Sequence, residues 1–199
     1  MTDNQNKTRD RVRVVSEEVL SDNWAILKKT TLDYQRADGS WQTLTRETYD
    51  RGNGAAILLY SREKHAVILT RQFRYPAFVN GHPEQLIEAC AGLLDDRDPA
   101  EAIRRETEEE TGYQISEPLK IMEIFMSPGS VTEKLFFFVA EYHVDLRVNE
   151  GGGLAEDGED ITVLEVDLDE GLRMIERGEI MDGKTIILLQ YAKLHHLMD

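Results

Sequence analysis

Short stretches in which hydrophobic and polar residues alternate fill the first 50 residues of the chain, and this pattern predicts β-strands. The Asp38-Gly39 pair interrupts the alternation and favours a hairpin turn. Two apolar runs follow, GAAILLY and HAVILTRQF, separated by the polar segment SREK. Their length and composition predict two buried strands that pair as a second hairpin.

A helix is predicted between an irregular segment, YPAFVNGHPE, and the next strands. Asp98 is a suitable N-cap, Pro99 fits the first helical position, and Gly112 supplies a left-handed C-terminal residue. Ile103 and Thr107 lie on one face of this helix and are expected to pack inward, which leaves its glutamates on other faces.

More strands are predicted at KIMEIFM, EKLFFFVAEYHV and ITVLEVDL, and an acidic, glycine-rich loop, GGGLAEDGED, precedes the last of them. Two helices close the chain, at Leu168–Arg177 and Lys184–Leu197. Helices and strands that alternate without strict βαβ repetition predict an α/β fold of α+β character, with a mixed sheet between helices. We expect residues 1–50 to form separate antiparallel strands and residues 51–199 to form the main domain.

The composition of the chain limits which binding partners and which cellular compartment are expected. The formal charge of −15 argues against nucleic acid or an anionic membrane as the main partner, although a small phosphorylated ligand remains compatible with it. The single cysteine, Cys90, is expected to be a buried thiol in a reducing compartment. The apolar runs are too short to span a bilayer, and the first residues do not resemble a signal peptide. A soluble, cytoplasmic protein is expected.

The segment RRETEEETGY places an unusual density of negative charge at the end of the predicted helix. Glu106, Glu109 and Glu110 project from one side, where the helix C-terminus is itself negative and the carboxylates repel one another. A hard divalent cation such as Mg²⁺ prefers a carboxylate cluster of this kind. A solvated acidic surface is the alternative interpretation of these residues.

The segment AGLLDDRDPAEAIRRETEEETGY, with its motif at residues 92–113, resembles the signature of the Nudix hydrolases, G-x5-E-x7-R-E-U-x-E-E-x-G-U, in which U is aliphatic. The residues that fall on this pattern are Gly92, Arg105, Glu106, Glu109, Glu110, Gly112 and Tyr113. The chain departs from the pattern in three ways. The interval between Gly92 and Arg105 is one residue short, so the first glutamate has no clear counterpart: Asp98 stands there when counting from Gly92, and Arg97 when counting from Arg105. Thr107 and the aromatic Tyr113 occupy the aliphatic positions.

The resemblance implies a Nudix fold and a hydrolase that cleaves a diphosphate with the help of Mg²⁺, or alternatively Mn²⁺. It implies metal ligation by Glu106, Glu110 and the backbone carbonyl of Ala91. Glu109 is implied as a further ligand or one that acts through water, and Arg105 as the residue that orients the glutamates. Glu159 in the acidic loop is implied as a ligand or general base, with Glu156 and Asp157 left open because this loop is longer than its counterparts.

Further segments resemble the sugar-nucleotide branch of the family, and in particular its members that hydrolyse GDP-mannose. Pro128 lies sixteen residues after Gly112, as in the ADP-sugar branch, and similar segments include LSDNW, RETYDRGNGAAILLY, LIEACAGLLDD and MSPGSVTE. The implied reaction is hydrolysis of GDP-mannose to GMP and mannose 1-phosphate. Hydrolysis of ADP-ribose is the alternative, and a non-catalytic sugar-nucleotide sensor is a more remote one.

The same resemblance assigns substrate contacts and a partner. It implies a homodimer in which the N-terminal strands of one chain form a wall of the other chain's pocket, with Trp24 stacked on the base. A buried position in the core is the alternative for Trp24. The residues implied to contact substrate are Trp24, Thr45, Arg46, Glu47, Arg74, Ala91, Gly92, Leu93, Glu110, Glu133, Gly158, Glu159 and Lys184.

Overall fold

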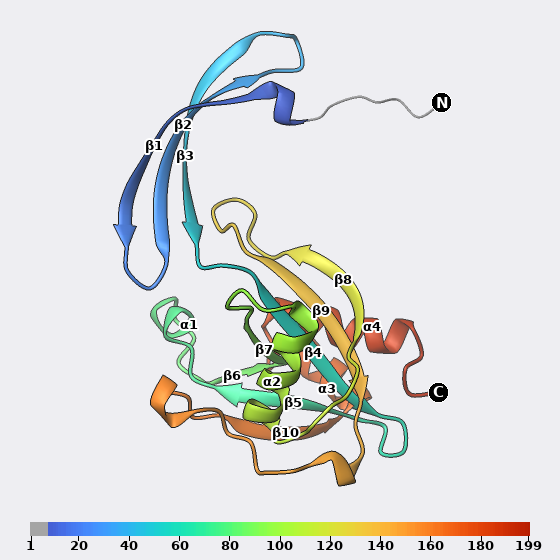
Figure 1. Ribbon diagram of the computed structural model, residues 1–199. Coiled ribbons are helices and arrows are strands. Elements are labelled where there is room, and N and C mark those ends of the chain that lie inside the picture. The colour runs from blue at the N-terminus through green and yellow to red at the C-terminus, as the bar shows by residue number, and fades with distance from the viewer. Residues whose placement is uncertain (1–7) are drawn as a thin grey trace, which may run out of the picture. The chain divides into compact units, whose positions relative to one another are not determined.

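A computed structural model describes residues 8–199, apart from the side chain of Asp157 (Figure 1). The chain divides into two compact units. Of the described residues, the first comprises residues 8–52 together with the segment Ser127–Glu133, and the second comprises Asn53–Met126 and Lys134–Asp199. None of the helices described is long and apolar enough to cross a membrane.

The first unit is an antiparallel sheet of three strands in the order β1-β2-β3, preceded by the 3-10 turn η1. Its elements are η1 at Thr8–Arg11, β1 at Val12–Asp22, β2 at Ile26–Gln35 and β3 at Trp41–Asp50. The hairpin predicted at Asp38-Gly39 is confirmed, since Gly39 has a φ of +85° and the Asp38 carboxylate accepts a hydrogen bond from the Ser40 amide at 2.9 Å. The strands are longer than the short ones predicted because neither Gly nor Pro interrupts them.

This sheet has no buried core among its described residues: every position in β1, β2 and β3 is exposed or half-buried. A sheet normally needs one packed apolar face to be stable. The large apolar side chains that it leaves exposed are Val14, Val15, Val19, Leu20, Trp24, Trp41 and Tyr49.

The second unit contains the seven-stranded sheet, whose main path is β10-β5-β4-β9-β8, with β6 paired to β5 and β7 to β4. Strands β4 and β9 are parallel and all other pairs are antiparallel, so the predicted mixed sheet is confirmed. The strands are β4 at Gly54–Ser61, β5 at Ala66–Gln72, β6 at Leu86–Glu88, β7 at Cys90–Leu93, β8 at Leu119–Phe125, β9 at Lys134–Glu141 and β10 at Thr162–Asp167.

Helices cover both faces of this sheet, as the sequence predicted (Figure 1). Helix α2, Pro99–Thr111, packs through Ile103 on the face that carries Ile57 and Phe138. Helices α3, Leu168–Glu176, and α4, Gly183–Leu194, pack on the opposite face. Successive residues of β4 alternate between the two layers and are buried in both, as in any strand enclosed on two sides.

Three local features differ from the expectation. The segment predicted as irregular contains a short helix, α1 at Tyr75–Val79, which Pro76 initiates near its first position. Helix α4 ends at Leu194 rather than Leu197, and His196 has a positive φ of 53° that is incompatible with its continuation. Two further 3-10 turns, η2 at Val144–Leu146 and η3 at Ala155–Asp157, lie in the loops that flank the glycine run.

Candidate active site

Helix α2 has the boundaries that the sequence predicted. The Asp98 carboxylate accepts hydrogen bonds from the Ala100 amide at 2.9 Å and the Glu101 amide at 3.4 Å, and Pro99 occupies the first position. Gly112 ends the helix with a φ of +78°. Its hydrogen could not be replaced by a methyl group, because a Cβ there would lie 2.1 Å from the Asn149 carbonyl oxygen.

The three glutamates at the end of α2 occupy different environments. Glu110 is buried with 2% of its surface exposed, whereas the side chains of Glu106 and Glu109 retain 16% and 26% exposure. The expectation that all of these glutamates leave the packed face is therefore wrong for Glu110, which lies beside the Cys90 thiol of β7. A freely solvated acidic surface does not describe this cluster.

Gly92 is the point at which β7 and α2 come closest. A Cβ on Gly92 would lie 2.3 Å from Cδ and 2.4 Å from Cγ of Glu106, so only glycine admits this carboxylate. Strand β7 is held in place by antiparallel pairing to β4, with Ala91 opposite Ala56 and Leu93 opposite Gly54. The Glu106 side chain consequently lies directly against the strand that precedes the helix.

Burial and mutual repulsion disfavour the charged forms of two of these carboxyls. Burial raises the pKa of Glu106 to about 7, and the negative charge of Glu109 adds to the increase. Burial raises the pKa of Glu110 to about 8, with a contribution from the charges of Glu106 and Glu159, while the Cys90 thiol acts in the opposite direction. Among the described residues, the Oε2 atom of Glu110 has no hydrogen-bond partner.

These observations fit a divalent cation. A buried carboxylate oxygen without a donor is costly, and repelling carboxyls become compatible with burial once a cation neutralises them. Oxygen-only ligands are what Mg²⁺ and Mn²⁺ prefer. The residues present therefore suit a hard metal ion held between β7 and the end of α2.

The glycine run Gly151-Gly152-Gly153 attaches the acidic loop to the C-terminus of α2. The Gly152 and Gly153 amides donate hydrogen bonds to the carbonyls of Glu110 at 2.9 Å and Glu109 at 3.1 Å. These carbonyls would otherwise lack intrahelical partners. The sequence indicated an acidic, glycine-rich loop here, but not that the glycine amides would donate hydrogen bonds to the carbonyls at the end of the helix.

Glu159 is brought to the cluster by this loop. Its Oε2 accepts a hydrogen bond from the Leu154 amide at 2.9 Å, and its charge raises the pKa of both Glu106 and Glu110. Gly158, at the end of η3, has a φ of +76°. Glu156 is exposed, and the side chain of Asp157 lies outside the described residues.

Arg105 contacts two of the glutamates from the solvent side. Its Nη2 lies 3.7 Å from Glu106 Oε1 and its Nε lies 3.5 Å from Glu109 Oε1. These distances exceed those of good hydrogen bonds, so the interaction is chiefly Coulombic. The geometry is compatible with a residue that orients the carboxylates.

Arg74 and Lys184 converge on a residue that sequence reasoning did not single out, Glu88 at the end of β6. Arg74 Nε donates to Glu88 Oε1 at 2.8 Å, and Lys184 Nζ donates to Oε2 at 2.5 Å. The carboxylate is almost completely buried. Its position in the apolar segment LIEACAG was a usable signal, because a lone acidic residue in such a segment needs a partner.

The remaining predicted substrate residues lie in the first unit, where they are exposed or paired locally. Trp24 is 69% exposed in the turn between β1 and β2, so the core interpretation is wrong for the chain by itself. Its ring lies 6.5 Å from that of Tyr49 and 5.9 Å from the Arg51 guanidinium. Arg51 also pairs with Glu133 at 2.6 Å, and Glu133 is buried by this contact.

Thr45, Arg46 and Glu47 are consecutive exposed residues of β3. Alternate side chains of a strand point to opposite faces, so Thr45 and Glu47 share one face and Arg46 lies on the other. Arg46 donates a hydrogen bond to the Thr45 carbonyl at 2.8 Å.

A separate group of metal-ligand types occurs among the described residues, at His65, Asp167 and Asp169, with ligand atoms within 4.8 Å of one another. Local contacts account for this group. Asp167 caps α3 by accepting from the Glu170 amide at 2.9 Å, and Lys193 pairs with Asp169 at 2.7 Å. The positive end of α3 also disfavours a cation here.

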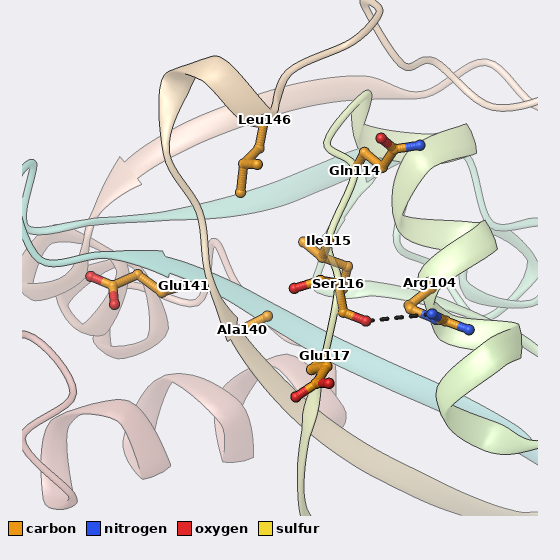
Figure 2. Close-up of a pocket in the computed structure, with 8 residues that line it drawn as sticks. All are labelled: Arg104, Gln114, Ile115, Ser116, Glu117, Ala140, Glu141 and Leu146. Atoms are coloured by element: carbon orange, nitrogen blue, oxygen red, sulfur yellow. Dashed lines mark hydrogen bonds between the residues drawn. The ribbon is translucent and has the colours of Figure 1, made fainter.

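A cavity of about 610 Å³ lies away from the glutamates (Figure 2). Arg104 is the residue of α2 that lines this cavity. It precedes Glu106 by two positions, so the two side chains point in directions about 200° apart around the helix axis. Figure 2 shows the Arg104 guanidinium directed at the Ser116 carbonyl, with a distance of 3.4 Å. The cavity contains none of the predicted site residues, and its lining consists of Arg104, Gln114, Ile115, Ser116, Glu117, Ala140, Glu141 and Leu146.

Comparison with known proteins gives matches over both units. Residues 11–49 match the GDP-mannose pyrophosphatase NudK N-terminal domain, and residues 50–181 match the NUDIX domain. The chain is 50% identical over 189 residues to a GDP-mannose pyrophosphatase of Enterobacter sp. (strain 638), a match that covers 94% of this chain and 98% of the relative. It is also 50% identical over 190 residues to GDP-mannose pyrophosphatases of Shigella flexneri and Escherichia coli O9:H4 (strain HS). Each of these two matches covers 95% of this chain and 98% of the relative.

Proposed function

The chain belongs to the NUDIX family, and from this premise we propose that it hydrolyses GDP-mannose to GMP and mannose 1-phosphate. The observation that carries the proposal is the half-buried Glu106 against Gly92 together with the buried Glu110, within a chain that is 50% identical to GDP-mannose pyrophosphatases over nearly its full length. A protein that only bound the sugar nucleotide would have no need for two neighbouring carboxylates that are withdrawn from water, one buried and one half-buried.

Nudix hydrolases generally use a divalent metal ion. We propose Mg²⁺, with Mn²⁺ as a substitute, held by Glu106, Glu110, Glu159 and the carbonyl of Ala91. A bound divalent ion supplies positive charge beside the diphosphate and lowers the pKa of water. The orphaned Oε2 atom of Glu110 supports this assignment.

The chain's own residues supply the remaining functions. We assign the general base to Glu159, because its loop is fastened to the end of α2 and its charge acts on Glu106 and Glu110. Glu109 adds negative charge to the cluster, and Arg105 restrains the carboxylates from the solvent side. Gly92, Leu93 and Gly158 are assigned to the backbone that contacts substrate.

Phosphate recognition is assigned to two cations of the second unit. Arg74 and Lys184 each retain N–H donors beyond those that Glu88 uses, since guanidinium offers five and ammonium three. Charge-assisted hydrogen bonds from such groups suit a diphosphate. Positive charge close to the phosphates is also needed because the chain as a whole carries −15.

The first unit is assigned to a homodimer and to recognition of the base and sugar. The exposed apolar residues of its sheet require a further surface, and a second copy of the chain is the occupant that the family resemblance implies. Trp24 offers an exposed ring for stacking on a purine. Thr45, Arg46, Glu47 and Glu133 are assigned to the same wall.

The test is hydrolysis of GDP-mannose and ADP-ribose measured side by side, with Mg²⁺ and then with EDTA. The proposal expects Mg²⁺-dependent release of GMP that is faster than release of AMP from ADP-ribose. Faster turnover of ADP-ribose would retain the mechanism and replace the substrate. Tight binding of GDP-mannose without turnover of either compound would support a sensor and overturn the enzymatic assignment.

The metal assignment is tested with Glu106→Gln, which preserves the volume of the side chain and removes its charge. Turnover is expected to fall by about 10²-fold or more, with loss of the response to Mg²⁺ and an unchanged circular dichroism spectrum. Near-normal turnover in this variant would contradict the metal assignment.

A further inference from the structure

Glu88 is a buried carboxylate that binds two cations at once. Arg74 holds it through two hydrogen bonds, Nε to Oε1 at 2.8 Å and Nη2 to Oε2 at 3.3 Å. Lys184 donates to Oε2 at 2.5 Å. Only 3% of the Glu88 side chain is exposed, so the geometry is set by these partners rather than by solvent.

The contacts of Lys184 extend the group to the start of α4. Its Nζ lies 3.0 Å from Asp182 Oδ1, and Asp182 caps α4 by accepting from the Thr185 amide at 3.0 Å. The Thr185 hydroxyl accepts from the Ala89 amide at 2.6 Å. The start of α4 is thereby fixed to the short link between β6 and β7, the strand that carries Gly92.

Charge balance in the group is complete, since Glu88 and Asp182 face Arg74 and Lys184. Burial alone would raise the pKa of Glu88, but the positive charges of Lys184 and Arg74 hold it below its ordinary value. Glu88 is therefore ionised throughout the neutral range.

The two cations differ in access to solvent. The Arg74 side chain is 41% exposed and that of Lys184 is 13% exposed. Arg74 also lies within Coulombic range of Glu110, whose negative charge contributes to raising the pKa of the guanidinium. The group thus borders the carboxylate cluster and presents free N–H donors beside it.

We propose that Glu88 is a positioning residue: its carboxylate fixes Arg74 and Lys184 in the geometry in which their remaining donors meet the substrate diphosphate. This inference rests on the proposed function, which assigns the two cations to the phosphates. Glu88 itself does not contact the substrate. Held in place before binding, the cations lose little side-chain entropy when the diphosphate arrives.

A purely structural ion pair is the competing explanation, and Glu88→Asp separates the two. Aspartate keeps the buried negative charge, so a charge-balancing role is largely preserved, but its carboxylate is one methylene shorter and cannot hold both cations in the same place. We expect KM for GDP-mannose to rise about tenfold or more while kcat changes much less, with the thermal midpoint almost unchanged.

A double-mutant cycle identifies the residue through which Glu88 acts. Glu88→Asp is combined with Arg74→Ala, and KM is measured for both single variants and the double variant. If Glu88 acts through Arg74, the aspartate substitution raises KM much less in the Arg74→Ala background than in the wild type. Fully additive effects would overturn an action through Arg74.

Glu141→Gln is the control, because it removes a carboxylate that forms an ion pair outside this group. Glu141 pairs with Arg62 at 3.2 Å. It should leave KM unchanged. A wild-type KM in Glu88→Asp, or failure of that variant to fold, would assign Glu88 to fold stability and overturn the inference. Absence of turnover in the wild type would instead remove the proposed function on which the inference rests.

Discussion

At the scale of single residues, the site combines two features that are unfavourable in isolation. Glu106 and Glu110 are carboxyls withdrawn from water, and burial together with neighbouring negative charges raises the pKa of both. Gly92 has no Cβ, and a Cβ there would lie 2.3 Å from Cδ of Glu106. Both features become favourable when a cation is bound, since its charge replaces the lost hydration.

The metal-free protein should lose stability as pH rises. Both carboxyls have folded-state pKa values, about 7 for Glu106 and about 8 for Glu110, above the ordinary value of 4.5. The folded state therefore holds more protons than the unfolded chain between these limits, and its stability falls across this range. Mg²⁺ should raise the melting temperature more at about pH 8 than at about pH 5.5, by about 2–4 °C for each kcal/mol of additional stabilisation. An equal shift at both pH values would contradict this.

Gly92→Ala should impair the metal site while leaving the fold intact. The added methyl group would lie 2.3 Å from Glu106 Cδ and must displace that side chain. We expect the Mg²⁺ concentration for half-maximal activity to rise by about tenfold or more. Gly171→Ala is the control, because its new Cβ would lie at an ordinary 3.6 Å from Leu189. A normal Mg²⁺ response in Gly92→Ala would show that Glu106 has room to move.

Sequence reasoning at this scale located the acidic cluster but not its environment. The motif placed Glu106 and Glu110 on one side of a helix, and helical periodicity placed that side away from the packed face. Whether a polar face is covered depends on a distant segment, here β7 and the glycine run. Glu88 was missed because its partners, Arg74 and Lys184, lie 14 and 96 residues away.

At the scale of elements, the carbonyls at the end of α2 accept hydrogen bonds from a loop rather than from solvent. The amides of Gly152 and Gly153 donate to the carbonyls of Glu110 and Glu109, and the same loop carries Glu159. A Cβ on Gly153 would lie 2.4 Å from Glu159 Oε2. The glycines therefore have two roles: their amides donate hydrogen bonds to the end of α2, and the absence of a Cβ at Gly153 leaves room for the Glu159 carboxylate.

Gly153→Ala and Gly178→Ala form a matched pair that tests the placement of Glu159. Both glycines have left-handed φ angles, +76° and +75°, so either substitution carries similar backbone strain of about 1–2 kcal/mol. Only the alanine at 153 would clash, because a Cβ at 178 meets nothing within 4 Å. We expect kcat to fall by about 10²-fold in Gly153→Ala alone. Similar activities in the two variants would contradict a catalytic role for Glu159.

Elements with strong local signals were predicted, and elements fixed by tertiary contacts were not. Helix α2 has an N-cap, an initial proline and a terminal glycine, and its predicted limits are confirmed. The hairpin of β4 and β5 is likewise confirmed by its register. Helix α1 was missed because five residues give too little periodicity to distinguish a helix from a loop.

At the scale of the whole molecule, the first unit does not bury an apolar core of its own in the described part of the chain. Its first and third strands expose Val14, Val19 and Trp41, and the Trp41 ring is covered only in part, by Arg13 at 4.0 Å. A sheet of this kind gains its stability from another surface. This is the reason to expect a dimer in solution.

Mixed dimers test whether active sites are shared between chains. Trp24→Ala should damage the pocket wall that a chain contributes to its partner. Glu106→Gln should damage the metal site of the chain that carries the substitution. If the wall is provided to the partner, a dimer of one chain of each kind contains one intact site. Equal amounts that exchange at random should then recover about one quarter of wild-type activity from two nearly inactive proteins.

The recovery must depend on exchange of chains, which gives the experiment its own control. The two variants should regain activity only after incubation at a concentration where dimers dissociate and re-form, while each variant alone stays inactive. If each chain instead walls its own pocket, a mixed dimer holds one site without Trp24 and one without Glu106, so mixing restores nothing. A monomer by analytical ultracentrifugation with full activity would likewise contradict shared sites, and would require the apolar face of β1–β3 to have a different occupant.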